Sequence, residues 1–430
     1  MLSYLKLTNV GPSPEMEIHF KPRMSFLTGD NGLGKTFLLD IAWWVLTRTW
    51  ARAPATPPLK GWKTPEGTAT GTSSIGYGYE KASGGLFKNE VIFNRVEQYW
   101  PLKPGRPAIA GMVIYAQVDG GFSAWDPARN YWKEKDPEKP DRPPAFRFKP
   151  EEVWDGLPRD SPEKLCNGLI LDWASWQREN GDAYTQLTRV LQALSPSSKE
   201  LLRPGKLMRI GLVDTRDQPT LLLPYKQEVP LAVASAGMRR IVALAYLLVW
   251  TWQEHLRACE IRGTKPAKEI VFLIDEIEAH LHPQWQRRIV KALLDVMRAL
   301  TETHAVSVQL IATTHSPLVL ASIEPDFDDQ KDAVWELDLV NDRVELRQFP
   351  WRRVGDVNNW LTSTVFDLSE PRGIEAEEAL REAQELLRRT SKPTLKEFEK
   401  VDQKLRKVLG DIDPFWIRWS HNLDQMRGEG

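Results

Sequence analysis

The sequence has little cysteine, almost no net charge and no long apolar run. The two cysteines, Cys166 and Cys259, lack the paired spacing of a disulfide framework or a zinc site. With 57 basic and 58 acidic residues the net charge is -1, which excludes a generally polyanion-binding surface. The longest apolar run, 241–250, is about half of the roughly 20 residues that a membrane span needs. The N-terminus has no signal-peptide pattern, so we expect a soluble cytoplasmic protein with no membrane partner.

The hydrophobic pattern alternates between strands and helices, which favours an α/β fold. Strands are expected at 2–8, 16–20, 24–28, 111–117, 269–275 and 306–313, and helices at 36–50, 235–257 and 283–300. Residues 51–105 contain a stretch rich in Pro, Gly, Thr and Ser and are interpreted as a loop or small β insertion. Residues 124–205 are interpreted as an irregular and then helical insertion. A hairpin that turns at Asn341 and Asp342 is expected over 334–349.

A glycine-rich segment with the spacing G-x-x-x-x-G-K-T follows the strand at 24–28. It consists of Gly29, Asp30, Asn31, Gly32, Leu33, Gly34, Lys35 and Thr36. Glycine is needed there because the backbone must wrap closely around a polyphosphate, and the following helix N-terminus presents positive potential to it. The segment therefore predicts an ATP-binding loop. We expect Lys35 to contact the β- and γ-phosphates, and the Thr36 hydroxyl to ligate Mg²⁺.

The apolar strand at 269–275 ends in two acids, Asp275 and Glu276. Carboxylates at the end of a buried strand are costly unless they meet a cation. The phosphate loop supplies the context for such a cation. We expect Asp275 to hold Mg²⁺ through water, and Glu276 to be the general base that polarises the attacking water.

One histidine and one glutamine at the ends of neighbouring strands complete the predicted site. His315 follows the strand at 306–313 within a T-T-H-S-P run, and we expect it to contact the γ-phosphate and to orient the attacking water. Gln117, at the end of the strand at 111–117, is our candidate for the side chain that senses Mg²⁺ and the γ-phosphate. Gln98 is the alternative.

The segment Ala234–Arg240 reads A-S-A-G-M-R-R and precedes the long helix. Ser235 is a good helix N-cap, and its hydroxyl with the free amides forms an anion site. Together with the preceding motifs, the segment resembles the signature of ABC-type ATPase heads of the RecF, SMC and OLD-like group, which reaches across to the ATP of a second subunit. Ser235 and Gly237 match that signature, whereas Ala236 replaces a glycine and Met238 the usual Gln or Glu. The resemblance implies a homodimer or higher oligomer in which Ser235 and Gly237 contact ATP.

The run from Glu278 to Pro283 reads E-A-H-L-H-P and follows the two acids. With the T-H-S-P run, it resembles the AAA-labelled, ABC-like ATPases of prokaryotic anti-phage systems, above all the Septu-type and retron-associated ones. In those modules a similar ATPase is paired with a separate HNH nuclease, so the resemblance implies a separate effector that this chain regulates. We do not interpret His280 and His282 as a metal site, because no third ligand stands nearby in the sequence.

Two other functions stay open at this point. A RecF-like DNA-repair clamp would need a basic stripe, and its candidates are more typical of solvated surface charges: Arg203, Lys206, Arg209 and Arg216. An inactive scaffold with slow turnover would fit the altered signature, but Glu276 and His315 argue against it. We therefore expect an ATPase with slow or regulated turnover, and a DNA partner stays open.

The expected fold is an α/β, ABC-type P-loop ATPase head over residues 1–350, followed by a helical extension over 351–430. The head should contain an antiparallel β lobe from the N-terminal strands and a helical insertion near 150–205. In the extension, charged amphipathic helices are expected at Ile374–Arg389 and Leu395–Leu409. They should form a hairpin that ends at Gly410 and the aromatic segment Pro414–Trp416.

Overall fold

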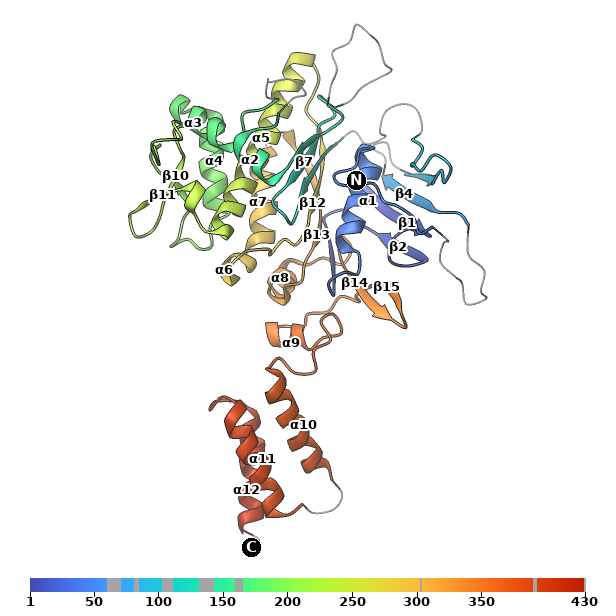
Figure 1. The fold of residues 1–430 in the computed structure, drawn as a ribbon, viewed down its shortest axis with the longest axis vertical. Coiled ribbons are helices and arrows are strands. Elements are labelled where there is room, and N and C mark those ends of the chain that lie inside the picture. The colour runs from blue at the N-terminus through green and yellow to red at the C-terminus, as the bar shows by residue number, and fades with distance from the viewer. Residues whose placement is uncertain are drawn as a thin grey trace. The chain divides into compact units, whose positions relative to one another are not determined.

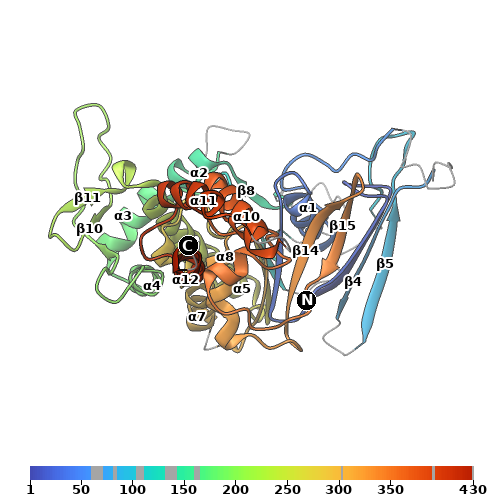
Figure 2. The same cartoon turned by 90° about the horizontal axis from the view of Figure 1, so that it is seen from below.

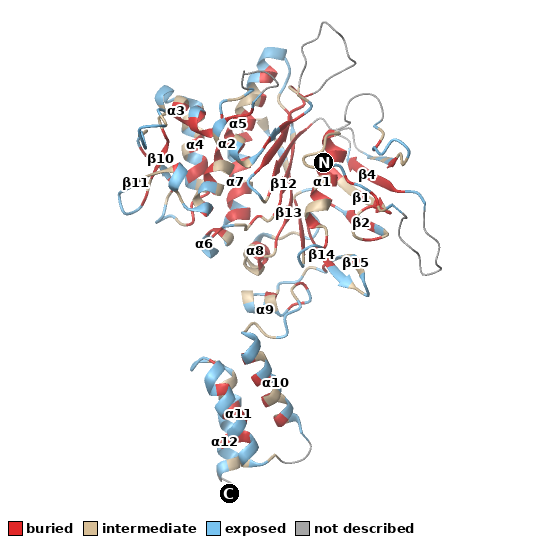
Figure 3. Ribbon diagram, viewed as in Figure 1, coloured by how far each residue is buried: buried red, intermediate tan, exposed pale blue. Residues whose placement is uncertain are grey.

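The computed structural model describes residues 1–59, 71–80, 85–102, 111–130, 143–158, 165–301, 304–389 and 393–428. The chain divides into two compact units, Met1–Gly355 and Asp356–Gly430 (Figure 1). The sequence analysis placed the boundary after residue 350. Each unit has a hydrophobic core of its own, visible as buried residues along its strands and inner helix faces (Figure 3).

An eight-stranded sheet in the order β15-β14-β3-β13-β12-β6-β7-β8 lies at the centre of the first unit. Its five parallel strands are β14 (Asp332–Val340), β3 (Met24–Gly29), β13 (Ser307–Thr313), β12 (Glu269–Ile274) and β6 (Met112–Ala116). Its antiparallel edge strands are β15 (Arg343–Gln348), β7 (Phe122–Trp125) and β8 (Phe146–Phe148). The parallel strands β6 and β12 are nearly continuous apolar runs, as expected for strands that are covered on both faces of a sheet. The carboxyl ends of β3, β12, β13 and β6 therefore meet at one edge.

A second, antiparallel sheet forms the β lobe, in the order β2-β1-β4-β5. Its strands are β1 (Leu2–Thr8), β2 (Glu15–His19), β4 (Ser74–Glu80) and β5 (Leu86–Ile92). The region 51–105 thus supplies two full strands of the lobe, β4 and β5, which lie beyond β14 and β15 in Figure 2. Strand β2 contacts β15. The parts of this region at 60–70, 81–84 and 103–110 lie outside the described residues.

Three helices dominate the first unit: α1 (Lys35–Thr47), α5 (Ala236–Arg262) and α7 (Ile289–Thr301). The expected single helix at 283–300 is wrong, because α6 (Pro283–Gln286) is separated from α7 by a turn. At this turn the Trp285 indole donates to the Leu194 carbonyl at 2.9 Å, and this tertiary anchor overrides the helical pattern. A short helix, α8 (Pro317–Ile323), follows β13 and was not expected.

The interpretation of the insertion is partly wrong. Its start, expected to be irregular, contains part of β7 as well as β8 and α2 (Pro150–Asp155), while 131–142 and 159–164 lie outside the described residues. Strands this short leave little periodicity between the surrounding prolines. The helical part consists of α3 (Leu169–Glu179) and α4 (Asp182–Ala193). A small sheet follows, formed by β9 (Arg203–Pro204), β10 (Thr220–Leu222) and β11 (Glu228–Pro230). The 3-10 helix η1 (Leu231–Val233) then leads to α5.

The second unit contains α9 (Val357–Leu361), α10 (Ile374–Arg388), α11 (Leu395–Val408) and α12 (Phe415–Gly428). The expected hairpin of two helices is present, but the aromatic segment that was expected to end it begins a third helix. Trp419 of α12 is fully buried, and its indole donates to Asp402 of α11 at 3.1 Å. Phe415 and Trp416 are half-buried and pack against the same core, so the aromatic segment is the start of a packed helix and not a terminator.

The fold class expected from the sequence is confirmed: an α/β head with an antiparallel β lobe, a helical insertion and a helical C-terminal extension. In the described part of the chain, no helix combines the length and the apolar character that a membrane crossing requires.

Candidate active site

The glycine-rich loop connects β3 to α1 in a conformation that only glycine adopts easily. Gly29 has a φ of 126° and Gly34 a φ of 96°. A Cβ on Gly29 would lie 2.0 Å from the Leu337 carbonyl oxygen, so β14 packs directly against this residue. No side chain caps α1, whose N-cap is Gly34. The first amides of the helix are therefore available to an anion.

Lys35 holds its ammonium group over this loop. Its Nζ donates to the carbonyl oxygens of Gly29 at 2.8 Å and Asp30 at 2.7 Å, and the residue is only 6% exposed. Burial lowers the pKa of Lys35, while the nearby carboxylates of Glu276 and Asp30 oppose this shift. A polyphosphate in the loop would offer oxygens with full negative charge in place of the two carbonyls.

Asp275, directly after β12, connects α1 to β13 through its side chain. Its buried carboxylate accepts hydrogen bonds from the Thr36 hydroxyl, 2.9 Å from each oxygen, and from the Thr313 hydroxyl at 2.9 Å. Carboxylate and hydroxyl oxygens are the ligands that Mg²⁺ prefers, so this donor set fits that ion. The structure thus brings together Thr36 and Asp275, two of the three residues that the sequence assigned to Mg²⁺.

Arg52 is a cation at this point that the sequence analysis did not identify. Its guanidinium donates to the Asp275 carboxylate at 3.2 Å, to the Tyr115 hydroxyl at 2.7 Å and to Asp40 at 3.3 Å. Burial raises the pKa of Asp40, which Arg52 counteracts. An arginine in a proline-rich stretch looks like a surface residue in the sequence, and only the fold places it against Asp275.

Glu276 and His315 lie side by side at the same edge of the sheet. The distance between Glu276 Oε1 and His315 Nε2 is 4.0 Å. Glu276 has a φ of 45°, and its amide donates to the Thr313 hydroxyl at 2.6 Å. A non-glycine residue in this left-handed region carries strain, of order 1 kcal/mol, that is typical of functional positions. Burial lowers the pKa of His315, and the charge of Lys35 lowers it further.

Glu278 connects the loop after β12 to the loop after β13, a role that the sequence analysis missed. Its carboxylate accepts from the Thr314 hydroxyl at 2.7 Å and from the His315 backbone amide. It therefore fixes the backbone position of the histidine that faces Glu276. His282, four residues later, uses its side chain to cap α6, accepting from the Gln284 amide at 3.3 Å.

Gln117 stands directly after β6, beside the end of β12, where the Asp275 amide donates to the Ala116 carbonyl at 2.9 Å. Its side-chain amide donates to the Ser123 hydroxyl at 3.1 Å. The alternative, Gln98, lies in an exposed turn of the β lobe and donates to the Arg95 carbonyl at 2.6 Å. Of the two, only Gln117 adjoins the Asp275 strand.

Ser235 and Gly237 begin α5. Ser235 is the N-cap and accepts from the Met238 amide at 3.4 Å. A Cβ on Gly237 would lie 2.7 Å from the carbonyl oxygen of His280, so glycine allows the helix start to pack closely against the loop after β12. Ser235 and Ala236 are exposed, which leaves the helix N-terminus open to another molecule.

A buried strand, a glycine loop, a helix that begins with Lys35 and Thr36, and the Asp275–Glu276 pair on a neighbouring strand define a P-loop ATPase. The chain belongs to the family described as "AAA domain, putative AbiEii toxin, Type IV TA system", whose profile matches residues 24–321. This membership confirms the expectation of an ATPase.

Curated relatives carry the names that the motifs suggested. The Septu protein PtuA of Bacillus mycoides (strain KBAB4) is 31% identical over 134 residues, which cover 31% of this chain and 16% of that protein. The retron Vc95 probable ATPase of Vibrio cholerae is 45% identical over 53 residues, 12% of this chain and 9% of that protein. The retron Ec83 probable ATPase of Escherichia coli is 30% identical over 100 residues, 23% of this chain and 15% of that protein. The matches thus span a small part of each relative, and they confirm the resemblance to Septu and retron ATPases.

Solved structures of SMC heads are also similar. The SMC head domain from Thermotoga maritima matches with a TM-score of 0.41 and 13% identity, over 81% of this chain and 99% of that one. An SmcHead bound to the C-winged helix domain of ScpA matches with a TM-score of 0.43 and 14% identity, over 81% of this chain and 98% of that one.

Proposed function

We propose that the chain binds ATP with Mg²⁺ at Gly29–Thr36, hydrolyses it slowly, and closes around it as a dimer. The observation that carries this proposal is the contact between Thr36 and Asp275, at 2.9 Å from each carboxylate oxygen. It brings the phosphate loop and a buried carboxylate to one point, as a phosphoryl-transfer site requires.

The side chains around that point have separate tasks. The Lys35 ammonium would give up its hydrogen bonds to the Gly29 and Asp30 carbonyls and donate to oxygens of the β- and γ-phosphates instead. Mg²⁺, when bound, supplies positive charge between the same phosphates. Glu276 would accept a proton from a water molecule as the water oxygen bonds to the γ-phosphorus and the bond to the ADP oxygen breaks. His315, 4.0 Å from Glu276, would orient this water.

The dimer is the second part of the proposal. The N-terminus of α5 is an anion site with an exposed N-cap, Ser235, and it lies on an element other than the phosphate loop. In the ATPase heads that the chain resembles, this signature contacts the ATP of a second subunit. We therefore assign Ser235 and Gly237 to the ATP bound by a second copy of the chain.

The third part is the biological role. The names of the relatives support an ATPase of an anti-phage defence system, in which the ATP state would control a separate effector, a nuclease of the HNH kind by resemblance. The alternative, a RecF-like DNA clamp, has weaker support. Two of its candidate basic residues are ion-paired, Arg209 with Asp217 at 3.2 Å and Arg216 with Asp214 at 2.8 Å.

The experiment that tests the ATPase and the dimer uses Glu276→Gln with Lys35→Ala as its control. Glu276→Gln should keep ATP binding, lose at least about a hundredfold in turnover, and accumulate as an ATP-bound dimer in light scattering. Lys35→Ala should stay nucleotide-free. Wild-type turnover in Glu276→Gln would show that the base is assigned wrongly, and a monomer with ATP bound would contradict the dimer.

The role in defence is tested by co-purification with the product of the neighbouring gene, with and without ATP. We expect wild type and Glu276→Gln to elute with the effector, and its nuclease activity to change with the nucleotide. Duplex DNA bound equally well with and without the effector would favour the clamp instead.

A further inference from the structure

Arg240 lies on α5 five residues after Ser235 and contacts the opposite side of the site. Its guanidinium donates to four backbone carbonyls: Val118 at 2.9 Å, Gln117 at 3.4 Å, Asp275 at 3.0 Å and Glu276 at 3.1 Å. Nη1 donates to the two carbonyls that follow β6, and Nη2 donates to the two carbonyls that follow β12. One side chain therefore contacts the backbone of three of the residues assigned to Mg²⁺ and to the attacking water, namely Gln117, Asp275 and Glu276.

The contacts of Arg240 are costly to lose and specific to arginine. Burial lowers its pKa, against the charges of Asp275 and Glu276. A planar guanidinium can donate in two directions at fixed angles, whereas a lysine ammonium is a single point charge. Losing the side chain would leave four carbonyl oxygens without this donor in a partly buried place.

The apolar packing around the start of α5 is incomplete. A cavity of about 200 Å³ lies between the start of α5, the turn Asp119–Phe122 and α2, and Arg240 is part of its wall. Apolar side chains such as Ile241 and Leu244 line the cavity but do not fill it. At the nucleotide end, the hydrogen bonds of Arg240 and the close approach of Gly237 to His280 therefore add to the apolar packing that holds α5.

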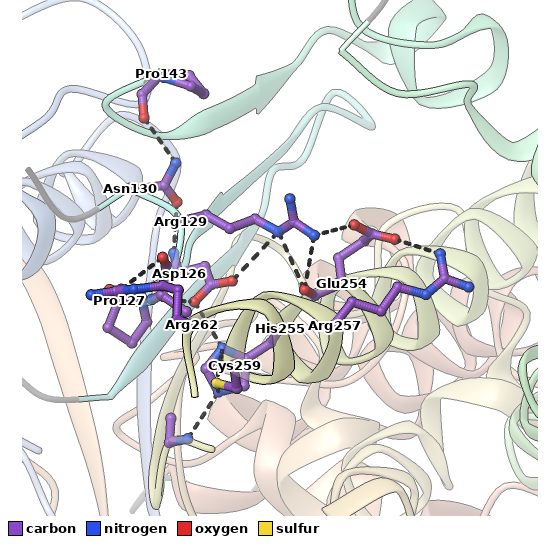
Figure 4. Close-up of polar contacts among 12 residues, drawn as sticks. Asp126, Pro127, Arg129, Asn130, Pro143, Glu254, His255, Arg257, Cys259 and Arg262 are labelled. Carbon is purple, nitrogen blue, oxygen red and sulfur yellow. Dashed lines mark hydrogen bonds and ion pairs between the residues drawn. The ribbon is translucent and has the colours of Figure 1, made fainter. Parts of the chain in front are cut away.

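The C-terminal end of α5 forms hydrogen bonds with the segment that follows β7, in the β6–β7 hairpin whose turn Arg240 contacts (Figure 4). His255 is 1% exposed; its Nε2 accepts from the Ala267 amide at 2.8 Å, so its Nδ1 carries the proton and donates to Asp126 at 2.7 Å. Arg129 donates to the Glu254 carbonyl at 3.0 Å, and Arg262 donates to the Ala128 carbonyl at 2.8 Å.

The two attachments are roughly 15 residues apart, or about 22 Å along the helix. A helix fixed at two such distant points to one hairpin cannot rotate or slide against it without breaking both sets of polar contacts. The helix and the β6–β7 hairpin therefore behave as one rigid body, with Ser235 at one end of the helix and Gln117 at the end of strand β6.

We propose that Arg240 is a positioning residue that couples the two halves of a composite site. Through it, Gln117 and Glu276 beside a chain's own ATP are held in register with Ser235 and Gly237, which close over the ATP of the partner. This inference rests on the proposed dimer, and the test below separates the two.

The test uses mixed dimers with a single intact site. A loop-donor chain carries Ser235→Phe, which blocks its signature, and a signature-donor chain carries Lys35→Ala, which disables its loop. Neither chain alone should hydrolyse ATP. Each mixed dimer should regain about half of the wild-type activity, so an equimolar mixture that assorts randomly should regain about a quarter. No activity in the mixture would reject the composite site, and with it the proposed function, before Arg240 is changed.

Arg240→Gln is then placed in either chain of the mixture. Coupling predicts at least a tenfold loss of kcat from both placements, with ATP affinity changed less than twofold. A loss only in the loop-donor chain would show that Arg240 serves its own ATP site alone. A loss only in the signature-donor chain would show that it merely supports Ser235. Either result overturns the coupling.

Two further variants exclude a general folding defect. Arg257→Gln changes an exposed arginine of the same helix, ion-paired with Glu254 at 3.0 Å, and should leave kcat and Tm unchanged. Arg240→Lys keeps the positive charge but lacks the planar guanidinium that donates in two directions. Its kcat should fall several-fold at an unchanged Tm. A kcat of wild-type size in Arg240→Lys would contradict the role of the four carbonyl contacts.

Discussion

At the scale of single residues, the carboxylate of Asp275 accepts hydrogen bonds from three side chains of the site. Thr36, Thr313 and Arg52 all donate to it, so Asp275→Asn keeps its shape but removes the charge that these donors and Mg²⁺ share. We expect ATP binding without Mg²⁺ to change little, and kcat in Mg²⁺ to fall at least about a hundredfold, or roughly 3 kcal/mol.

Fluorescent-nucleotide titrations with and without Mg²⁺ measure this separation. Asp338→Asn is the matched control, since it removes an exposed carboxylate from β14. The assignment of Asp275 would be wrong if Mg²⁺ strengthened nucleotide binding equally in wild type and in Asp275→Asn.

His315 gives the site a pH dependence whose sign follows from its environment. Burial, and then the charge of Lys35, lower the pKa of His315 below its ordinary value of 6.5, so the imidazole is neutral at pH 7. Activity should therefore persist somewhat below pH 6.5 and then fall as the imidazole gains a proton. Since the unfolded chain binds this proton more readily, the folded state also loses stability as the pH falls through the same range.

A pH profile of kcat/KM at saturating Mg²⁺ measures this effect. His315→Gln should lower kcat about tenfold to a hundredfold and remove the acid limb. If the acid limb keeps its midpoint in His315→Gln, another group causes it.

At the scale of helices and strands, long periodic elements were predicted well and short or locally unusual ones were not. The strands that end at Gly29 and Ile274 are buried and mostly apolar, and the motifs that follow them placed the loop and the two acids correctly. β7 and β8 are too short to show a period, and α12 was missed because Phe415 and Trp416 follow a proline. Arg52 and Glu278 could not be predicted, because their roles depend on side-chain contacts between segments distant in the sequence.

The attachment of α5 at His255 is a stability determinant of this element. His255→Ala leaves the Ala267 amide and one Asp126 oxygen without their buried partner, at a cost of about 2–4 kcal/mol. His255→Asn can still donate to Asp126 from a similar position and should cost about half as much. Urea unfolding measures both values, and losses below about 0.5 kcal/mol in both variants would contradict the attachment.

At the scale of the whole molecule, the two units can be treated separately. Every residue of the candidate site lies in Met1–Gly355, whereas Asp356–Gly430 has a core built from its own helices. A chain that ends at Gly355 should therefore fold and bind ATP with an affinity within about threefold of the full chain, a change below roughly 0.7 kcal/mol.

Nucleotide titration and thermal unfolding compare the ATP affinity and the Tm of the two chains, with Lys35→Ala in the short chain as the control. A short chain that is folded but binds ATP more than tenfold more weakly would show that the second unit supports the ATP site.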